Sequence, residues 1–269
     1  MVWSDKLKKN QESYQNVHWS QRWNDDQSAI RFNKHVIGMR NHSQNLVDGL
    51  LINPNYHILE IGPGTGPLTI PLSSRVEHIT AIEPSPYMIK VLKENLDEHH
   101  IQDVSIIQKR WEDIDPQLDL YGPYDLVLAS HSLGMDNLKA AIQKMDDVSS
   151  GYVCLFWFFN SSFLKSAYIT LWPSLHGKEY NPLPKSDVIY QILLQMGIHP
   201  EFKPYVTENQ YRYSSIEEAI SDFSINFGFF NRSPPHILEE FIRENSFTKN
   251  DDVHIAGTSM NAKIWWHKN

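Results

Sequence analysis

Short apolar segments alternate with amphipathic segments from residue 57 to residue 197. Five segments have the length and the β-branched or aromatic content of buried strands: one beginning at residue 57, then 78–84, 104–111, 124–132 and 151–159. Between them, apolar residues recur at helical spacing, as in Met88, Val91, Leu92 and Leu96. Strands alternating with helices are typical of an α/β fold, a doubly wound and mostly parallel sheet with helices on both faces.

Polar residues indicate where several helices begin and end. Asp136 precedes the apolar stripe that starts at Leu138, and we expect it to cap that helix. Ser215 and Glu218 have the spacing of a capping box. Gly197 follows a helical pattern that ends near Met196, and glycine is the usual residue just past a helix end.

The alternation ends after residue 197. Segments 202–214 and 254–268 read as strands, so we expect seven strands with an antiparallel strand near the C-terminus. Segment 160–187 has three prolines and many aromatic residues without a clear period, which favours a cap-like insertion over a ligand crevice. The expected organisation is an N-terminal helical lid over 1–50 and one α/β domain over 51–269.

Composition limits the class of protein. With 269 residues, 41% hydrophobic and 21% charged, the chain has material for a sizeable core. A net charge of −8 argues against binding to nucleic acid by neutralising phosphates. Cys154 is the only cysteine, and the histidines show no paired spacing with acids, so neither a disulfide nor a metal site is expected. The longest apolar stretch, 153–159, is too short to span a bilayer, and a cytoplasmic protein is expected.

The segment HILEIGPGTGPLTIPL (57–72) contains the main candidate for chemistry. Gly62, Gly64 and Gly66 follow a buried strand, and glycines there indicate positive φ or a close approach of backbone to another group. In an open α/β sheet this loop lies at the carboxyl ends of the strands, where ligands bind. A tight turn without a ligand is the alternative interpretation.

Two acids indicate which ligand suits the loop. Glu60, at the end of the first strand, would repel a pyrophosphate but attract an ammonium group. The spacing G-x-G-x-G also differs from the dinucleotide pattern G-x-G-x-x-G. Glu83 ends the next strand, where an acid can accept hydrogen bonds from ribose hydroxyls. An amino acid joined to a nucleoside describes S-adenosylmethionine.

Four segments in order resemble the motifs of class I S-adenosylmethionine-dependent methyltransferases, which have a Rossmann-like fold: LEIGPGTGPLT, AIEPSPYMI, VSIIQKRWEDID and YDLVLASHSL. The resemblance implies cofactor contacts from Glu60, Gly62, Pro63, Gly64, Thr65, Gly66, Glu83, Pro84, Met88, Arg110, Trp111, Glu112 and Ser130. Arg110 stands where the family often has Asp, so an adenine contact could come instead from Glu112 or from the backbone of Trp111. Trp111 could equally be a core residue.

Acceptor-side residues are less specific. His131 follows the fourth strand and is the preferred general base, with His18 and His176 as alternatives, although a purely structural histidine fits equally well. Lid or substrate contacts are expected from an aromatic-rich set: Tyr14, His18, Trp19, Trp23, Trp157, His176 and Tyr180. Ordinary packing of an N-terminal helix is the alternative for the first four.

The sequence therefore predicts a methyltransferase that acts on a small, partly apolar or aromatic molecule by in-line transfer. The expected cofactor is S-adenosylmethionine, and the expected partners exclude nucleic acid and membranes. A non-catalytic S-adenosylmethionine-binding protein with a regulatory or assembly role is the alternative. An NAD-dependent oxidoreductase is disfavoured by the glycine spacing and by Glu60.

Overall fold

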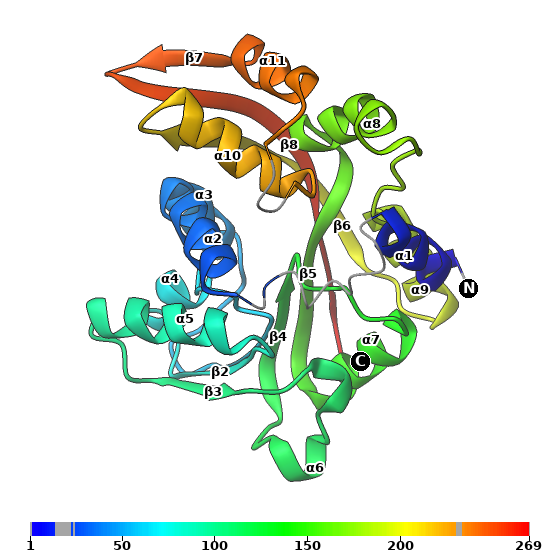
Figure 1. The fold of residues 1–269 in the computed structure, drawn as a ribbon. Coiled ribbons are helices and arrows are strands. Elements are labelled where there is room, and N and C mark those ends of the chain that lie inside the picture. Colours follow the sequence, from blue (N-terminus) through cyan, green and yellow to red (C-terminus); the bar gives the residue numbers. More distant parts are fainter. Residues whose placement is uncertain (1, 14–22, 24, 230–232, 269) are drawn as a thin grey trace.

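A mixed sheet of eight strands forms the centre of the molecule in the computed structural model. The structure describes residues 2–13, 23, 25–229 and 233–268, and at residues 161–164 it describes the backbone alone. The strand order is β3-β2-β1-β4-β5-β8-β6, and β7 pairs with β8 (Figure 1). Their bounds are β1 (His57–Ile61), β2 (His78–Ile82), β3 (Val104–Ile107), β4 (Tyr124–Ser130), β5 (Ser149–Ser162), β6 (Glu201–Tyr213), β7 (Ser246–Lys249) and β8 (Asp252–His267). Strands β1 to β5 run parallel and β8 is antiparallel to β5 and β6, which confirms the predicted fold class. The short β7 is an addition to the expected seven strands.

Helices cover both faces of the sheet (Figure 1). They are α1 (Val2–Ser13), α2 (Asp26–Gly38), α3 (Arg40–Asp48), α4 (Thr69–Ser73), α5 (Pro86–Glu98), α6 (Pro116–Asp119), α7 (Leu138–Val148), α8 (Phe163–His176), α9 (Ser186–Gln195), α10 (Ile216–Asn226) and α11 (His236–Glu244). Side chains from α1, α7 and α9 share one core with the sheet, and α3 packs on the other face. Ile58 and Leu59 are adjacent in β1 yet belong to opposite cores, which explains the continuous apolar run.

Three strands continue far beyond the carboxyl ends of β1 to β4. The distal parts of β5, β6 and β8 carry α8, α10, α11 and β7, and together these form what we call the upper lobe (Figure 1). The upper lobe has its own apolar core, which includes Trp172, Phe223 and Phe227. It stands past the carboxyl edge, where ligands of such sheets bind.

The segment 160–187 contains a regular helix that the sequence pattern did not predict. Helix α8 spans Phe163–His176 and holds Pro173 inside it. Ala167, Leu171 and Trp172 of this helix are buried in the upper lobe's core. Pro173 and apolar residues outside the buried face, such as the exposed Ile169, concealed its helical period.

Local signals at helix ends are mostly confirmed. The Ser215 hydroxyl accepts a hydrogen bond from the Glu218 N–H at 3.1 Å, and Gly197 has φ of +78° just past α9. The expected cap at Asp136 was wrong, because α7 begins one residue later. The Asn137 side chain accepts from the Ala140 N–H at 3.1 Å and is the cap.

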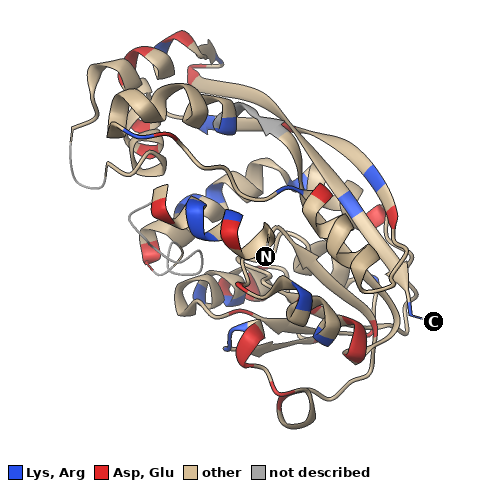
Figure 2. Cartoon of the chain, turned by 90° about the vertical axis from the view of Figure 1, so that its right-hand side faces the viewer, with Lys and Arg blue, Asp and Glu red and all other residues tan. Residues whose placement is uncertain are grey.

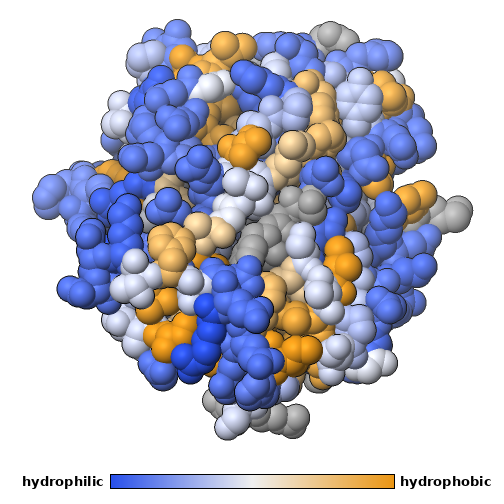
Figure 3. Space-filling model, turned by 90° about the horizontal axis from the view of Figure 1, so that it is seen from above, coloured by the Kyte–Doolittle hydropathy of each residue, from blue (hydrophilic) through white to orange (hydrophobic). Residues whose placement is uncertain are grey.

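The surface is mixed in charge and mostly hydrophilic. Basic and acidic residues alternate over the face shown in Figure 2. From above, hydrophobic side chains form small, separated groups on a hydrophilic surface (Figure 3). Among the described residues, no helix combines the length and apolar character needed to cross a bilayer.

Candidate functional site

The loop between β1 and α4 requires glycine for two reasons. Gly62, Gly64 and Gly66 all have positive φ, at +68°, +59° and +94°. The Gly62 N–H donates to the carbonyl of Ile82 at 2.8 Å, which draws the loop onto the end of β2. A Cβ atom on Gly62 would also overlap the Cβ of Ser132. The loop thus presents backbone at the carboxyl edge with no room for a side chain at its first glycine.

Glu60 is a buried acid under this loop. Its side chain is 2% exposed, and its carboxylate accepts a hydrogen bond from the Thr69 hydroxyl at 2.7 Å. Burial raises the pKa of Glu60 to about 7, helped by the charge of Glu83 and opposed by the Thr69 hydrogen bond. The hydroxyl of Thr65, in the loop, is buried and has no hydrogen-bond partner among the described residues. A cationic, hydrogen-bonding ligand would satisfy both groups.

Glu83 connects the end of β2 to the same loop. One carboxylate oxygen accepts from the Gly64 N–H at 3.1 Å, and the other accepts from the Ser85 N–H at 2.9 Å. Burial raises the pKa of Glu83, and these two hydrogen bonds oppose that change. Each oxygen keeps a lone pair for a further donor, such as a hydroxyl. Pro63 is buried within the loop, and Pro84, between Glu83 and Ser85, is half-buried.

His131 lies directly after β4 in a left-handed conformation, with φ of +55°. Its N–H donates to the carbonyl of Phe156 at 2.9 Å, and its ring lies 4.8 Å from the ring of Phe158. The Nδ1 atom is 3.2 Å from the Ser130 hydroxyl, and Nε2 is 3.4 Å from Oδ1 of Asn261. Burial lowers the pKa of His131 to about 4, so the imidazole is neutral at ordinary pH.

Comparisons with known proteins show which family has this loop and these acids. A family model described as a methyltransferase domain matches residues 58–150, which contain Glu60, the glycine loop, Glu83 and His131. Residues 58–150, about a third of the chain, thus form a methyltransferase domain of the class that uses S-adenosylmethionine. Two solved structures share the fold of the chain.

The first is the YcgJ protein of Bacillus subtilis, with a TM-score of 0.54 and 12% identity, over 83% of this chain and 98% of that chain. The second is magnesium protoporphyrin IX methyltransferase of Synechocystis PCC 6803 with bound SAH. It has a TM-score of 0.51 and 14% identity, over 97% of this chain and 98% of that chain. These identities are low, so the likeness is one of fold.

Curated relatives correct one expectation from the sequence. An uncharacterized protein of Haemophilus influenzae is 22% identical over 90% of this chain and 88% of its own. Ribosomal RNA small subunit methyltransferase A of Malacoplasma penetrans is 34% identical over 68 residues, which is 25% of each chain. An rRNA adenine N-6-methyltransferase of Limosilactobacillus reuteri is 30% identical over 70 residues, 26% of this chain and 29% of its own.

The expected exclusion of nucleic acid was therefore wrong. Proteins named for action on RNA share part of this methyltransferase's sequence, over about a quarter of the length of each. The net charge of −8 belongs to the whole chain. It does not describe the local surface on which an acceptor lies, so it cannot exclude a class of acceptor.

Helix α2 lies against the glycine loop of the methyltransferase. The ring of Phe32 is 3.1 Å from the position that a Cβ on Gly64 would take. Nδ2 of Asn95 donates to Asn33 on α2 at 3.0 Å and to the carbonyl of Thr65 at 2.7 Å. The sequence had indicated neither Phe32 nor the two asparagines, although Ala29, Phe32 and Asn33 have the spacing of one helix face.

Met88 and Trp23 lie beside this contact. Met88 is buried in a small cluster with Ala29 and Val91, and Trp23 packs against that cluster. The Ser85 hydroxyl donates to the carbonyl of Trp23 at 2.6 Å. Tyr14, His18 and Trp19, the other predicted lid residues, lie outside the described residues.

The side chains of the third motif bond to partners outside the glycine loop. Trp111 is 2% exposed, and its Nε1–H donates to the carbonyl of Ala141 on α7 at 3.1 Å. Arg110 pairs with Glu112 at 2.7 Å on the surface. The ring of Trp111 is thus a core group, and a cofactor contact from its backbone stays a prediction.

Of the other aromatic candidates, Trp157 packs beside His131, with 6.3 Å between the ring centroids, whereas His176 and Tyr180 do not. Trp157 is fully buried, and its Nε1–H donates to the carbonyl of Pro184 at 2.8 Å. His176 and Tyr180 belong to the upper lobe, where Nε2 of His176 lies 2.9 Å from the carbonyl of Phe227. These two side chains stabilise the upper lobe, because a lobe that stands off the main sheet needs its own core.

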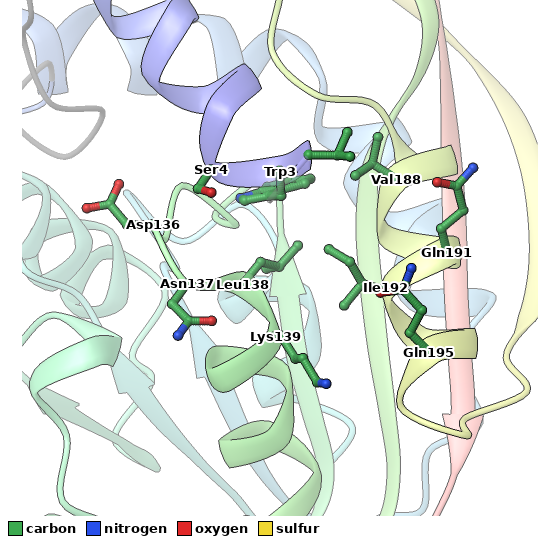
Figure 4. A pocket seen from close by; sticks show the side chains of 11 residues that line it. Trp3, Ser4, Asp136, Asn137, Leu138, Lys139, Val188, Gln191, Ile192 and Gln195 are labelled. Atoms are coloured by element: carbon green, nitrogen blue, oxygen red, sulfur yellow. The ribbon is translucent and has the colours of Figure 1, made fainter.

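The structure has a cavity away from the glycine loop and another beside it. A groove of about 500 Å³ runs between α1, α7 and α9, with Trp3, Leu138 and Ile192 in its wall (Figure 4). A second cavity of about 190 Å³ lies under α2 and is lined by Thr65, Asn95 and neighbouring residues. The described residues contain no group of three or more acids, histidines or cysteines placed to hold a metal ion.

Proposed function

We propose that this methyltransferase transfers the methyl group of S-adenosylmethionine to a small, partly apolar acceptor at the carboxyl edge of β4 and β5. The cofactor, when bound, supplies an electrophilic methyl group on a sulfonium. Glu60 would hold its ammonium group, and Glu83 would accept from its ribose hydroxyls. Met88 would pack near the adenine.

The donor half of the proposal is supported by the two buried acids. A carboxylate in an apolar site is costly unless a cation or several donors face it. Among the described residues, the Glu60 carboxylate accepts a side-chain hydrogen bond from Thr69 alone, and burial raises the pKa of Glu60 to about 7. An ammonium group beside it would restore the charged form.

The proposed acceptor site is supported mainly by three neighbouring side chains. Ser130, His131 and Phe158 are half-buried side chains at the carboxyl edge, and they offer a hydroxyl, a neutral imidazole and an aromatic face. The upper lobe stands over this edge (Figure 1). A hydroxyl and an imidazole beside an aromatic face favour an acceptor with both a polar and an apolar part.

His131 is the proposed base. If the acceptor attacks through O–H, N–H or S–H, the methyl carbon–sulfur bond would break as the new bond to carbon forms, leaving a neutral thioether, and the neutral imidazole of His131 would take the acceptor's proton. Such a base contributes about 10²- to 10⁴-fold to the rate. Correct alignment of donor and acceptor contributes more, roughly 7–11 kcal/mol of the barrier.

The test is transfer of labelled methyl from S-adenosylmethionine. The protein is incubated with a low-molecular-mass extract in one arm and with ribosomal RNA in the other. Label in the small-molecule fraction, absent with Glu60→Ala, is the expected result. Label in RNA would overturn the proposed acceptor, and cofactor binding without transfer in either arm would favour the non-catalytic alternative.

A further inference from the structure

A chain of buried polar side chains connects His131 to helix α3. Nε2 of His131 lies 3.4 Å from Oδ1 of Asn261 on β8. The amide nitrogen of Asn261 donates to the Thr207 hydroxyl on β6 at 2.8 Å, and that hydroxyl lies 3.4 Å from Nε2 of His42 on α3. Asn261 and Thr207 are 4% and 3% exposed. Buried polar groups of this kind are held in place by their partners.

The direction of these hydrogen bonds determines where the ring hydrogen of His131 lies. Because Asn261 uses its N–H group toward Thr207, it turns its carbonyl oxygen toward His131. A carbonyl oxygen can only accept, so Nε2 of His131 must carry the hydrogen. A neutral imidazole carries one ring hydrogen, so Nδ1 has the lone pair.

The far end of the chain agrees with this direction. The Thr207 oxygen accepts from Asn261, and its own hydrogen is free to point toward Nε2 of His42. Burial lowers the pKa of His42, so its ring is a neutral group that can accept there. The ring of His42 stacks on Tyr205, at 5.9 Å between centroids, which fixes its plane.

We propose that Asn261 is a positioning residue that holds His131 in the tautomer with hydrogen on Nε2. Nδ1, beside the Ser130 hydroxyl, is then the nitrogen that can take a proton. The rings of Trp157 and Phe158 pack against the imidazole from its other sides. The use of Nδ1 in catalysis rests on the proposed function, whereas the tautomer is a property of the free protein.

Long-range ¹H–¹⁵N spectra of protein labelled at histidine measure the tautomer directly, without cofactor or acceptor. The His131 signals are assigned by their loss in His131→Gln. At neutral pH, the wild type should show hydrogen on Nε2 and a lone pair on Nδ1. Asn261→Leu should convert this single form into a mixture or into the opposite tautomer.

Two further variants make the test decisive. Thr207→Val removes the acceptor that orients the Asn261 amide, and it should also release the tautomer; it decides the question if Asn261→Leu does not fold. Asn209→Leu is the matched control, because Asn209 donates to Ser259 at 2.6 Å across the same strand pair without reaching His131. It should leave the His131 signals unchanged.

Hydrogen on Nδ1 in the wild type would overturn the proposal, as would an unchanged tautomer in both the Asn261 and Thr207 variants. Failure of the proposed function has a different signature. Full turnover by His131→Ala would remove the base role while leaving the tautomer as measured.

Discussion

The Thr69 hydroxyl donates a hydrogen bond to a carboxylate oxygen of Glu60 at 2.7 Å, and both residues are buried. Thr69 is the first residue of α4, so this bond joins the end of β1 to the helix beyond the glycine loop. It orients an acid whose ionisation is disfavoured by its surroundings. The loop is thereby prepared for a cation before any ligand arrives.

Cofactor binding should weaken as the pH falls through 7. The pKa of Glu60 is about 7 in the free protein, and the ammonium group of S-adenosylmethionine would select its charged form. Affinity should therefore be about tenfold lower at pH 5.5 than at pH 7. Titration calorimetry at several pH values measures this. Glu60→Gln should bind more weakly with a flat dependence, and an equal slope in that variant would assign the effect to another group.

Glu60→Gln should stabilise the ligand-free protein at high pH. The folded pKa of about 7 exceeds the ordinary value of 4.5, so ionisation between these values works against the folded state. At pH 8 the change should raise the free energy of unfolding by roughly 3 kcal/mol, and at pH 4 by much less. Urea unfolding at the two pH values gives the comparison. A gain of the same size at both would show that packing, not charge, is responsible.

Gly62→Ala should cost more than an alanine at another left-handed glycine. Gly62 and Gly177 have φ of +68° and +66°, so the backbone strain of about 1–2 kcal/mol is common to both. Only at Gly62 does the added methyl overlap Ser132, whereas it meets nothing within 4 Å at Gly177. Thermal unfolding and calorimetry with S-adenosylhomocysteine should show a larger loss of stability, and lost binding, for Gly62→Ala alone. Similar behaviour of the two variants would mean that the loop adjusts.

The pH–rate profile should show no protonation of His131 near its usual pKa. Burial lowers the pKa of His131 to about 4, so the imidazole is already neutral at pH 6. With saturating cofactor, kcat should be level between pH 6 and 8, and His131→Ala should lower it by about 10²-fold. A loss below tenfold, with only KM for the acceptor raised, would make His131 a binding residue.

Helix α2 should exchange its amides more slowly when the donor site is filled. It contacts the glycine loop through Phe32 and the upper lobe through the ion pair of Arg31 with Asp222 at 3.6 Å. We propose that α2 is part of a lid formed by the N-terminal helices. S-adenosylhomocysteine should therefore slow amide hydrogen exchange in residues 25–38. Hydrogen exchange with mass spectrometry measures the change, with α9 as the internal reference. Equal exchange with and without the ligand would make α2 a static support.

The parts of the site that the sequence could predict lie within single short segments. Glu60 and the three glycines lie within seven residues, so their spacing alone predicts a ligand-binding loop. Glu83 follows at the end of the next strand. Asn261 and Thr207 could not be found in this way. Each resembles an ordinary polar residue of a strand, and only the pairing of β6 with β8 brings them together behind His131.

The positions of two tryptophan rings also could not be predicted from local sequence. Trp111 and Trp157 were both candidates for the site, yet each indole N–H donates to a buried carbonyl. An indole has a large apolar surface and one donor, so it is satisfied by a buried carbonyl as readily as by a ligand. Local sequence does not distinguish these two fates, because the choice depends on helices packed from elsewhere.

The length of β5, β6 and β8 has a mechanical consequence. These strands have 14, 13 and 16 residues and extend from the main sheet into the upper lobe, with a register shift between β5 and β8 after Phe158. Hinging the lobe away would shear the ladder that pairs β6 with β8 along all of β6. The pairing of β6 with β8 therefore predicts that the upper lobe moves little relative to the main sheet. Substitutions on the upper lobe would then change which acceptor fits, while the glycine loop keeps its geometry.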